Sequence, residues 1–243
     1  MYTKGDFHIH STFSDGGLTP KEIITLAKNH NVDILALTDH NCTLGIDEAI
    51  LAGNKLNITV IPGVELSTRY KNSRVHILGY FKDDSYKNEL LIEILKYVKE
   101  DKVYKIKKLL GNKINFCPRN NKLCVENGIE LLKFFGATVV MAHPVLLNNN
   151  IFNKLINLDF DGIEAKYFSN SEEDTKKFIS IAKERDLYYT AGSDFHNVQE
   201  LYRAHGMLGD IFLTEDEISL FLKKSKLPFW ITKKHFLMYK LFR

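Results

Sequence analysis

The chain has 243 residues, of which 44% are hydrophobic and 26% charged, a composition typical of an ordinary soluble globular protein. The formal net charge of +3 is too small to indicate a strong nucleic-acid or membrane field, and no apolar run approaches the roughly 18 residues of a transmembrane helix. The three cysteines are an odd number without CxxC spacing, which argues against a disulfide framework or a zinc ribbon. Together with a polar N-terminus unlike a signal peptide, these features predict a cytoplasmic protein.

The first part of the chain predicts short strands that alternate with helices. A strand at 7–9 precedes a capping box at 19–22, with Pro20 at the first helical position of the helix that follows. Buried strands are expected at 34–37 and 59–61, with a short helix at 44–51 between them. Two further strands, at 64–68 and 75–80, predict a hairpin around residues 71–73.

The rest of the chain opens with a helical segment and then returns to alternation. Apolar residues recur at helical spacing over 86–110, and the lysines on the opposite face indicate a solvated surface. A helix at 126–135 leads into a strand at 137–141. The last third predicts strands at 162–165 and 187–191, a helix at 172–185 and a second capping box at 214–217, which opens a helix through 222.

This order of elements favours a parallel sheet or an α/β barrel. We expect residues 1–243 to form a single domain with a small helical insertion at about 84–135. The tail at about 227–243 combines aromatic and basic residues. We expect it to pack on the barrel or on a partner subunit, whereas a membrane-surface helix is less favoured because one short segment anchors weakly.

Ligand-type side chains gather in or just after the predicted strands. They are His8, His10, Asp15, Asp39, His40, Glu65, His76, His143, Asp194 and His196. In an α/β barrel the C-terminal ends of the strands converge on one mouth, so these groups would meet there. Burying them without a partner would be costly, and imidazole with carboxylate suits divalent zinc, iron or manganese.

Each motif alone also has an ordinary structural interpretation. A His-x-His pair can form a polar rim, and Asp39 can either orient a ligand histidine or cap a helix. The repeated placement at strand ends, in one chain, favours a metal site.

The chain resembles the PHP (polymerase and histidinol phosphatase) family of metallophosphoesterases from about Phe7 to about Leu222. The matching motifs, in family order, are FHIHSTFSDG at 7–16, LTDHN at 37–41, IPGVELS at 61–67, VHILG at 75–79, AHP at 142–144 and GSDFH at 192–196. This resemblance implies a distorted, seven-stranded (β/α)7 TIM-like barrel with a trinuclear metal site.

The resemblance also implies which residues hold up to three divalent ions (Mn, Zn or Fe). The first ion would be held by His8, His10, Glu65 and Asp194. Glu65 would bridge to the second, which His76 and His143 complete, and the third would be held by Asp15, His40 and His196. Three dications against three carboxylates leave a positive mouth that suits phosphate. We expect a metal-bridging hydroxide to attack the phosphoester, with Asp194 handling the proton of the water.

Four further residues could bind substrate, although each also fits an ordinary surface position. These are Lys166, whose strand end should face the mouth, Arg69, Arg119 and His205. The nucleotide-acting subgroup of the family usually carries an arginine-histidine segment before the Ala-His-Pro strand, and residues 115–119 match it poorly.

Three functions remain open at this point. The first is a phosphoesterase that acts on nucleotides or short oligonucleotides. The second keeps the site but takes histidinol phosphate or another small phosphorylated molecule. The third is a non-catalytic, metal-bearing module that binds nucleic acid, which the complete ligand set disfavours. The modest charge argues against long duplex DNA as a partner, and an oligomer could form through the tail.

Overall fold

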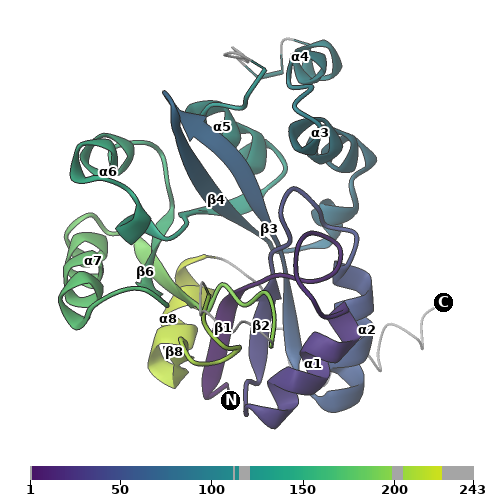
Figure 1. The fold of residues 1–243 in the computed structure, drawn as a ribbon, viewed down its shortest axis with the longest axis vertical. Helices are drawn as coiled ribbons and strands as arrows, with labels where there is room; N and C mark the ends of the chain where they lie inside the picture. Colours follow the sequence, from purple (N-terminus) through teal and green to yellow (C-terminus); the bar gives the residue numbers. More distant parts are fainter. Residues whose placement is uncertain (1, 112, 115–120, 199–204, 226–243) are drawn as a thin grey trace.

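The computed structural model describes residues 2–111, 113–114, 121–198 and 205–225 (Figure 1). Arg119 and the tail at 227–243 lie outside this part of the chain. Eight strands form one sheet in the spatial order β7-β6-β5-β4-β3-β2-β1-β8. They are β1 (Lys4–Ile9), β2 (Ile34–Leu37), β3 (Thr59–Tyr70), β4 (Ser73–Phe81), β5 (Ala137–Met141), β6 (Gly162–Tyr167), β7 (Tyr188–Gly192) and β8 (Leu213–Thr214).

The first seven strands follow one another in chain order around a nearly closed barrel. Strands β1 to β3 pair in parallel, β3 to β5 pair antiparallel, and β5 to β7 are parallel again. An isolated bridge between Ile9 and Phe195 joins the end of β1 to the segment after β7. The predicted TIM-like α/β barrel is therefore confirmed, and the two-residue β8, paired antiparallel with β1, adds an eighth strand.

Helices surround the sheet. They are α1 (Pro20–Asn29), α2 (Ile46–Leu56), α3 (Glu89–Lys99), α4 (Tyr104–Leu110), α5 (Val125–Phe134), α6 (Asn149–Leu155), α7 (Glu172–Glu184) and α8 (Glu215–Lys224), with 3-10 turns η1 (Asp84–Lys87) and η2 (Pro144–Leu146). The two predicted capping boxes are present, and Ser171 with Asp174 forms another. Among the described residues, no helix is long and apolar enough to cross a membrane.

Two elements differ from the sequence expectation. The helical pattern over 86–110 is divided between η1, α3 and α4, because Asp101 adopts a left-handed backbone with a φ of 56° that a continuous helix cannot contain. The strands expected at 59–61 and 64–68 form one strand, β3. It pairs with β2 up to Pro62 and with β4 from Gly63, so Pro-Gly marks a change of partner rather than an end.

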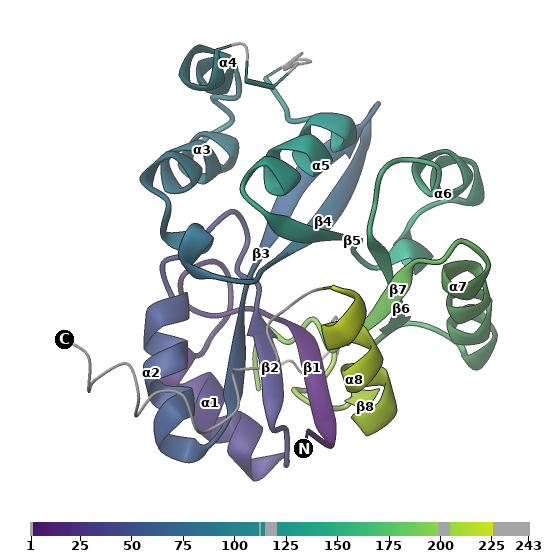
Figure 2. The ribbon, with the colours of Figure 1, turned by 180° about the vertical axis from the view of Figure 1, so that it is seen from behind.

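The β3–β4 hairpin extends beyond the barrel, and α3, α4 and α5 lie around it (Figures 1 and 2). These three helices fall between β4 and β5, the range in which the helical insertion is expected. Apart from the main hydrophobic core, a smaller cluster of buried side chains comes from β1, β2, β3, β4, β5, β7 and α8. There Phe7 contacts Phe221 and Tyr80 edge-on, at ring-centroid distances of 4.9 and 6.3 Å, so α8 contributes to the packed barrel interior.

Candidate metal centre

The structure brings the nine predicted metal ligands together at one end of the barrel. His8 and His10 come from β1 and the residue after it, Glu65 and His76 from the hairpin, and the others from the segments that follow β1, β2, β5 and β7. Ligand atoms within 4.8 Å of one another form four overlapping groups: His8, His10, Glu65 and Asp194; His10, Asp15, His40 and His196; His40, Glu65 and His76; and Asp194, His196 and His205.

The most buried group surrounds one point. Glu65 Oε2 lies 3.2 Å from Nε2 of both His8 and His10, and 3.1 Å from His40 Nδ1. Asp194 Oδ1 lies 3.2 Å from His8 Nε2 and 3.1 Å from His10 Nε2. Within the described chain, none of these five buried atoms has a hydrogen-bond partner of acceptable geometry. Such atoms are costly to leave unsatisfied, so the donor set fits a cation at the point where they converge.

Glu65 faces two sets of histidines. While Oε2 meets His8, His10 and His40, the other oxygen, Oε1, lies 2.9 Å from His76 Nδ1 and 3.1 Å from His143 Nε2. A carboxylate between two imidazole sets can contact two cations at once.

The third set is more open to solvent. Asp15, whose side chain is 53% exposed, lies 3.3 Å from His196 Nε2 and 3.6 Å from both His40 Nε2 and His10 Nδ1. This arrangement leaves one side of the cluster accessible to a ligand.

The cluster strongly perturbs its own protonation. Burial lowers the pKa of His10, but the carboxylates of Asp194 and Glu65 outweigh it and raise that pKa to about 9. Burial would raise the pKa values of Glu65 and Asp194, but the neighbouring histidines, His8 above all, hold both well below their ordinary values. For His40, burial dominates and lowers the pKa to about 4. Without metal, the site therefore holds protons where it would otherwise hold cations.

Glu164 supports two of the histidines, a role that the sequence analysis missed. Its Oε1 lies 2.9 Å from His8 Nδ1, and its Oε2 accepts a 2.7 Å hydrogen bond from the His143 backbone N–H. The side chain is fully buried. In the sequence, this role was signalled only by a lone carboxylate in the apolar run Gly-Ile-Glu-Ala. Gly192 is part of the same contact, because a Cβ there would lie 2.3 Å from both Glu164 Oε1 and His8 Cβ.

A β-bulge in β6 sets which side chains reach the site. Glu164 pairs with Thr190 while Lys166 pairs with Ala191, so β6 has one extra residue. This shift turns Tyr167 toward the cluster, where its hydroxyl donates a 2.9 Å hydrogen bond to Asp194 Oδ2. Lys166 instead forms a 2.6 Å ion pair with Glu217 of α8, whereas we expected it to face the mouth.

Two buried aspartates accept hydrogen bonds from the loops that carry the predicted ligands. Asp39 accepts hydrogen bonds from Ser11 N, Ser11 Oγ and Ser14 Oγ at 2.6–2.7 Å, so it holds the loop after β1 rather than a histidine directly. Asp6 accepts from Ser193 Oγ at 2.6 Å and from Gly209 N at 2.9 Å, and burial raises its pKa to about 6. The hydrogen bond to Asp6 holds Ser193, the residue before Asp194.

Two of the predicted ligand residues have left-handed backbones. His143 has a φ of 27° and Asp194 a φ of 54°, conformations that cost L-residues on the order of 1 kcal/mol or more. The surrounding hydrogen bonds keep both residues in place, which is typical of side chains held for function.

The other predicted substrate residues have different outcomes. His205 lies beside the cluster, with Nδ1 3.1 Å from Asp194 Oδ2 and its ring centroid 3.9 Å from that of His196. Arg69 lines a cavity of about 300 Å³ that also contacts Asp15, His40 and His76. Arg119 lies outside the described residues, so its role in substrate binding stays a prediction.

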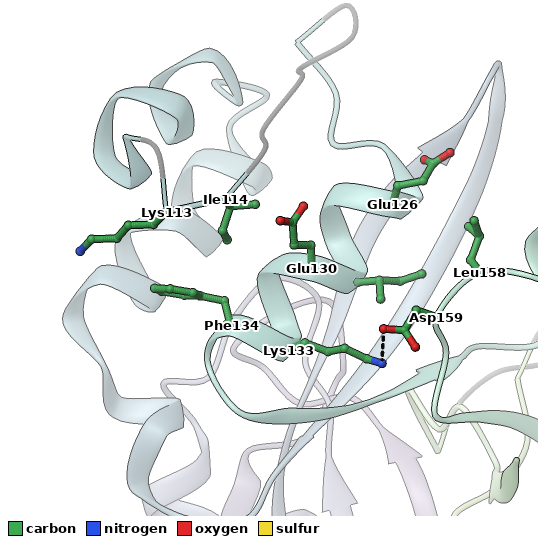
Figure 3. Close-up of a pocket in the computed structure, with 9 residues that line it drawn as sticks. Lys113, Ile114, Glu126, Glu130, Lys133, Phe134, Leu158 and Asp159 are labelled. Carbon is green, nitrogen blue, oxygen red and sulfur yellow. Dashed lines mark ion pairs between the residues drawn. The ribbon is translucent and has the colours of Figure 1, made fainter.

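A larger cavity of about 520 Å³ lies against α5, where Phe134, Ile114 and Lys133 line it (Figure 3). Lys133 forms a 2.8 Å ion pair with Asp159 at this cavity. None of the nine metal-ligand candidates lines it, whereas Asp15, His40 and His76 line the smaller cavity.

A histidine and carboxylate cluster at the mouth of an α/β barrel fits the class of metal-dependent hydrolases. The chain matches the family model of the PHP domain over residues 6–207, so it belongs to the PHP domain family. It is accordingly a metal-dependent phosphoesterase, a hydrolase of phosphoric esters, as the motifs predict.

Relatives of similar length are known. A 5′-3′ exoribonuclease of Haemophilus influenzae is 28% identical over 250 residues, covering 81% of this chain and 91% of the relative. A 3′,5′-nucleoside bisphosphate phosphatase of Chromobacterium violaceum is 27% identical over 264 residues, covering 85% and 92%.

Two solved structures share the architecture. One, from Bifidobacterium adolescentis, superposes with a TM-score of 0.71 at 21% identity, over 91% of this chain and 96% of its own, which supports the barrel fold. The other, an amidohydrolase from Chromobacterium violaceum, has a TM-score of 0.68 at 26% identity and covers 81% and 88%.

Proposed function

We propose that this protein hydrolyses phosphoesters of nucleotides or short oligonucleotides, at a site that holds up to three divalent cations. The observation that carries this proposal is the convergence of five buried, unsatisfied ligand atoms from His8, His10, His40, Glu65 and Asp194. A cavity of about 300 Å³ adjoins this point and is lined by His40, Asp15 and His76, which would give a phosphorylated ligand access to the edge of the site.

The ligand sets follow the three groups of side chains. His8, His10, Glu65 and Asp194 would hold one cation. Glu65, His76 and His143 would hold a second, and Asp15, His40 and His196 a third. Imidazole and carboxylate donors suit manganese, zinc or iron.

Bound divalent ions lower the pKa of water and neutralise phosphate charge, the two requirements of phosphoester hydrolysis. In that reaction, a P–O bond forms to water, the ester P–O bond breaks, and a proton passes to the leaving oxygen. Asp194 would take the proton of the water. Its Oδ2 is held by Tyr167 and His205 at 2.9 and 3.1 Å, so Oδ1 is oriented toward the cluster.

The choice of substrate draws support from the relatives. The two similar proteins from Haemophilus influenzae and Chromobacterium violaceum are named for acting on RNA and on nucleoside bisphosphates. The Chromobacterium violaceum structure contains sulfate, a tetrahedral anion like phosphate. Histidinol phosphate remains the alternative substrate within the same site.

A phosphate-release assay tests the proposal. Chelator-treated protein reloaded with manganese would be offered nucleoside monophosphates, bisphosphates, short RNAs and histidinol phosphate. We expect turnover of the nucleotide substrates. Faster turnover of histidinol phosphate would reassign the substrate, and a metal-loaded protein inactive on every compound would support a non-catalytic binding module.

Two variants test the site. We expect Asp194→Asn and His196→Ala each to lower turnover at least 100-fold, because each removes a group of the metal centre. Glu172→Gln, on the exposed face of α7, is the matched control and should keep wild-type rates. Near wild-type rates after metal removal would contradict the mechanism.

We also propose that residues 1–243 form one domain with an insertion at about 84–135. The three cysteines show no disulfide pattern, which supports a reducing compartment, and we propose that the protein is cytoplasmic. Association through the tail at 227–243 is tested by truncation after Ser225 and light scattering.

A further inference from the structure

We propose that the cavity along α5, called here the α5 groove, is a docking site for residues 226–243 of the same chain. This groove of about 520 Å³ is separate from the cavity that adjoins the metal centre. Two placements are expected for the tail, on its own chain or on a partner subunit, and the contacts of α5 and α8 favour its own chain. The proposal does not depend on the enzymatic activity of the protein.

The α5 groove combines apolar surface with charged side chains. Ile114 and Ile129 line it and are each 4% exposed, whereas Phe134 of α5 is 46% exposed. An aromatic ring left half open beside buried isoleucines is a surface that a further apolar segment can cover. The charged residues that line the groove are Lys113, Glu126, Glu130, Lys133 and Asp159 (Figure 3).

The charges of the groove and of the tail are complementary. Three carboxylates and two lysines line the groove, and one of these lysines, Lys133, also pairs at 3.1 Å with Asp161. The balance in this region is therefore negative. The tail at 226–243 contains five lysine or arginine residues and no aspartate or glutamate, together with the apolar run Phe229-Trp230-Ile231. Opposite charges would orient the tail while its aromatic residues cover Phe134.

The described chain ends close to the groove. Ser225, which follows α8, is buried, and its carbonyl oxygen accepts a 3.3 Å hydrogen bond from Thr138 Oγ1 of β5. The next residue of β5, Val139, donates its backbone N–H to Asp161 Oδ2 at 2.8 Å. Oδ1 of the same carboxylate pairs with Lys133, which lines the groove. A short series of contacts thus connects the start of the tail to the groove.

The length of the tail is sufficient for this placement. Thr138 lies four residues after Phe134, and four residues of chain span at most about 14 Å. Phe229 lies four residues after Ser225, so the first aromatic residues of the tail have a similar reach. A segment tethered at so short a range has an effective concentration on the order of millimolar, which favours docking within one chain over docking on a second copy in dilute solution.

The single tryptophan of the chain, Trp230, lies in the tail, so its fluorescence reports on docking in the full-length protein. In the wild type we expect blue-shifted emission and weak quenching by acrylamide, relative to the same protein in urea. Phe134→Ser should shift the emission to the red and raise the quenching toward the urea value, because the tail loses its aromatic contact. Leu51→Ser, at an exposed leucine of α2 outside the groove, is the control and should match the wild type.

A charge reversal gives a second test that leaves the apolar surface of the groove intact. Glu126→Lys with Glu130→Lys should also expose Trp230, because the groove would then repel the basic tail. Glu172→Lys with Glu173→Lys, the same change of charge on the exposed side of α7, should keep the wild-type fluorescence. Circular dichroism checks that each variant is folded, and the charge reversal decides the proposal if Phe134→Ser is not.

A wild-type Trp230 that is quenched as strongly as in urea would overturn the proposal, and so would unchanged fluorescence in both groove variants. Exposure of Trp230 by Leu51→Ser would place the tail on α2 instead. Sedimentation and quenching measured over a range of protein concentrations separate the two possible sources of the tail. Protection of Trp230 that appears only together with a dimer would assign the groove to the tail of a second copy and refute docking within one chain.

Discussion

Glu65 presents its two carboxylate oxygens to different histidines, and this division depends on how each imidazole is oriented. His8 illustrates the point, because Nε2 faces Glu65 and Asp194 while Nδ1 is held by Glu164 at 2.9 Å. A carboxylate on the far nitrogen sets the tautomer and raises the basicity of a ligand imidazole. We therefore expect Glu164 to be a positioning residue for the proposed metal centre.

We expect Glu164→Gln to weaken metal binding about 10- to 100-fold, since supporting groups of this kind have effects of that size. Manganese titration of the chelator-treated protein would measure the change, and high manganese should restore part of the activity. Glu172→Gln is the control. Unchanged metal affinity in Glu164→Gln would contradict the positioning role.

The grouping of the nine proposed ligand side chains could be predicted, because each stands in a short local motif next to an apolar strand. Glu164 and Tyr167 could not, because their roles arise from contacts across β1, β6 and β7 that no local pattern records. The expectation for Lys166 failed for a related reason. It assumed a regular strand, whereas the bulge in β6 changes which residues face the mouth.

At the scale of the element, α8 is attached to the barrel through Glu217. This carboxylate completes the capping box with Thr214, pairs with Lys166 at 2.6 Å and accepts a 2.9 Å hydrogen bond from the Tyr189 hydroxyl. The contacts join the start of α8 to β6 and β7, at positions where both charged side chains are about four-fifths buried.

We therefore expect Lys166→Met to lower the free energy of unfolding by roughly 1–3 kcal/mol while leaving KM for the phosphoester unchanged. The reason is that Glu217, about four-fifths buried, loses its cation, whereas the proposed metal centre keeps its ligands. Urea denaturation measures the free energy of unfolding, and steady-state kinetics measures KM. Lys176→Met, with a 75% exposed side chain on α7, is the control. A raised KM with unchanged stability would instead return Lys166 to substrate binding.

Other element boundaries show where sequence patterns stop being informative. Apolar runs and capping boxes located most strands and helices, since burial and caps are local properties. The division of 86–110 into separate helices and the union of the two strands in β3 depend on backbone geometry at Asp101 and on the partner change at Pro62. Strand β8 has only two residues, too few to carry a pattern.

On the scale of the whole molecule, the barrel gathers imidazoles and carboxylates from segments as distant as His8 and Asp194 and buries them together. The protein without metal must stabilise this cluster with protons. Burial lowers the pKa of His10, but its carboxylate neighbours raise it to about 9, against an ordinary value near 6.5. Protonation, metal loading and folding are therefore linked.

The sign of this linkage follows from the raised pKa. The stabilisation by protonated His10 is fully present below about pH 6.5 and is lost as pH rises through about 9, so metal-free protein should become less stable over that interval. The loss should reach up to about 3 kcal/mol. Metal, in contrast, needs neutral imidazole, so metal affinity should rise with pH over the same interval and binding at neutral pH should release protons.

Urea denaturation in chelator at pH 6.5, 7.5 and 9 measures the first effect, and calorimetry in buffers of different ionisation enthalpy measures proton release on manganese binding. The His10→Gln variant isolates the share of this residue, because the stability difference from wild type should shrink toward pH 9 in the metal-free proteins. The metal-loaded wild type is a further control and should lack this pH dependence. If the difference in unfolding free energy between metal-free wild type and His10→Gln stayed constant or grew with pH, the cluster would not hold its proton at His10.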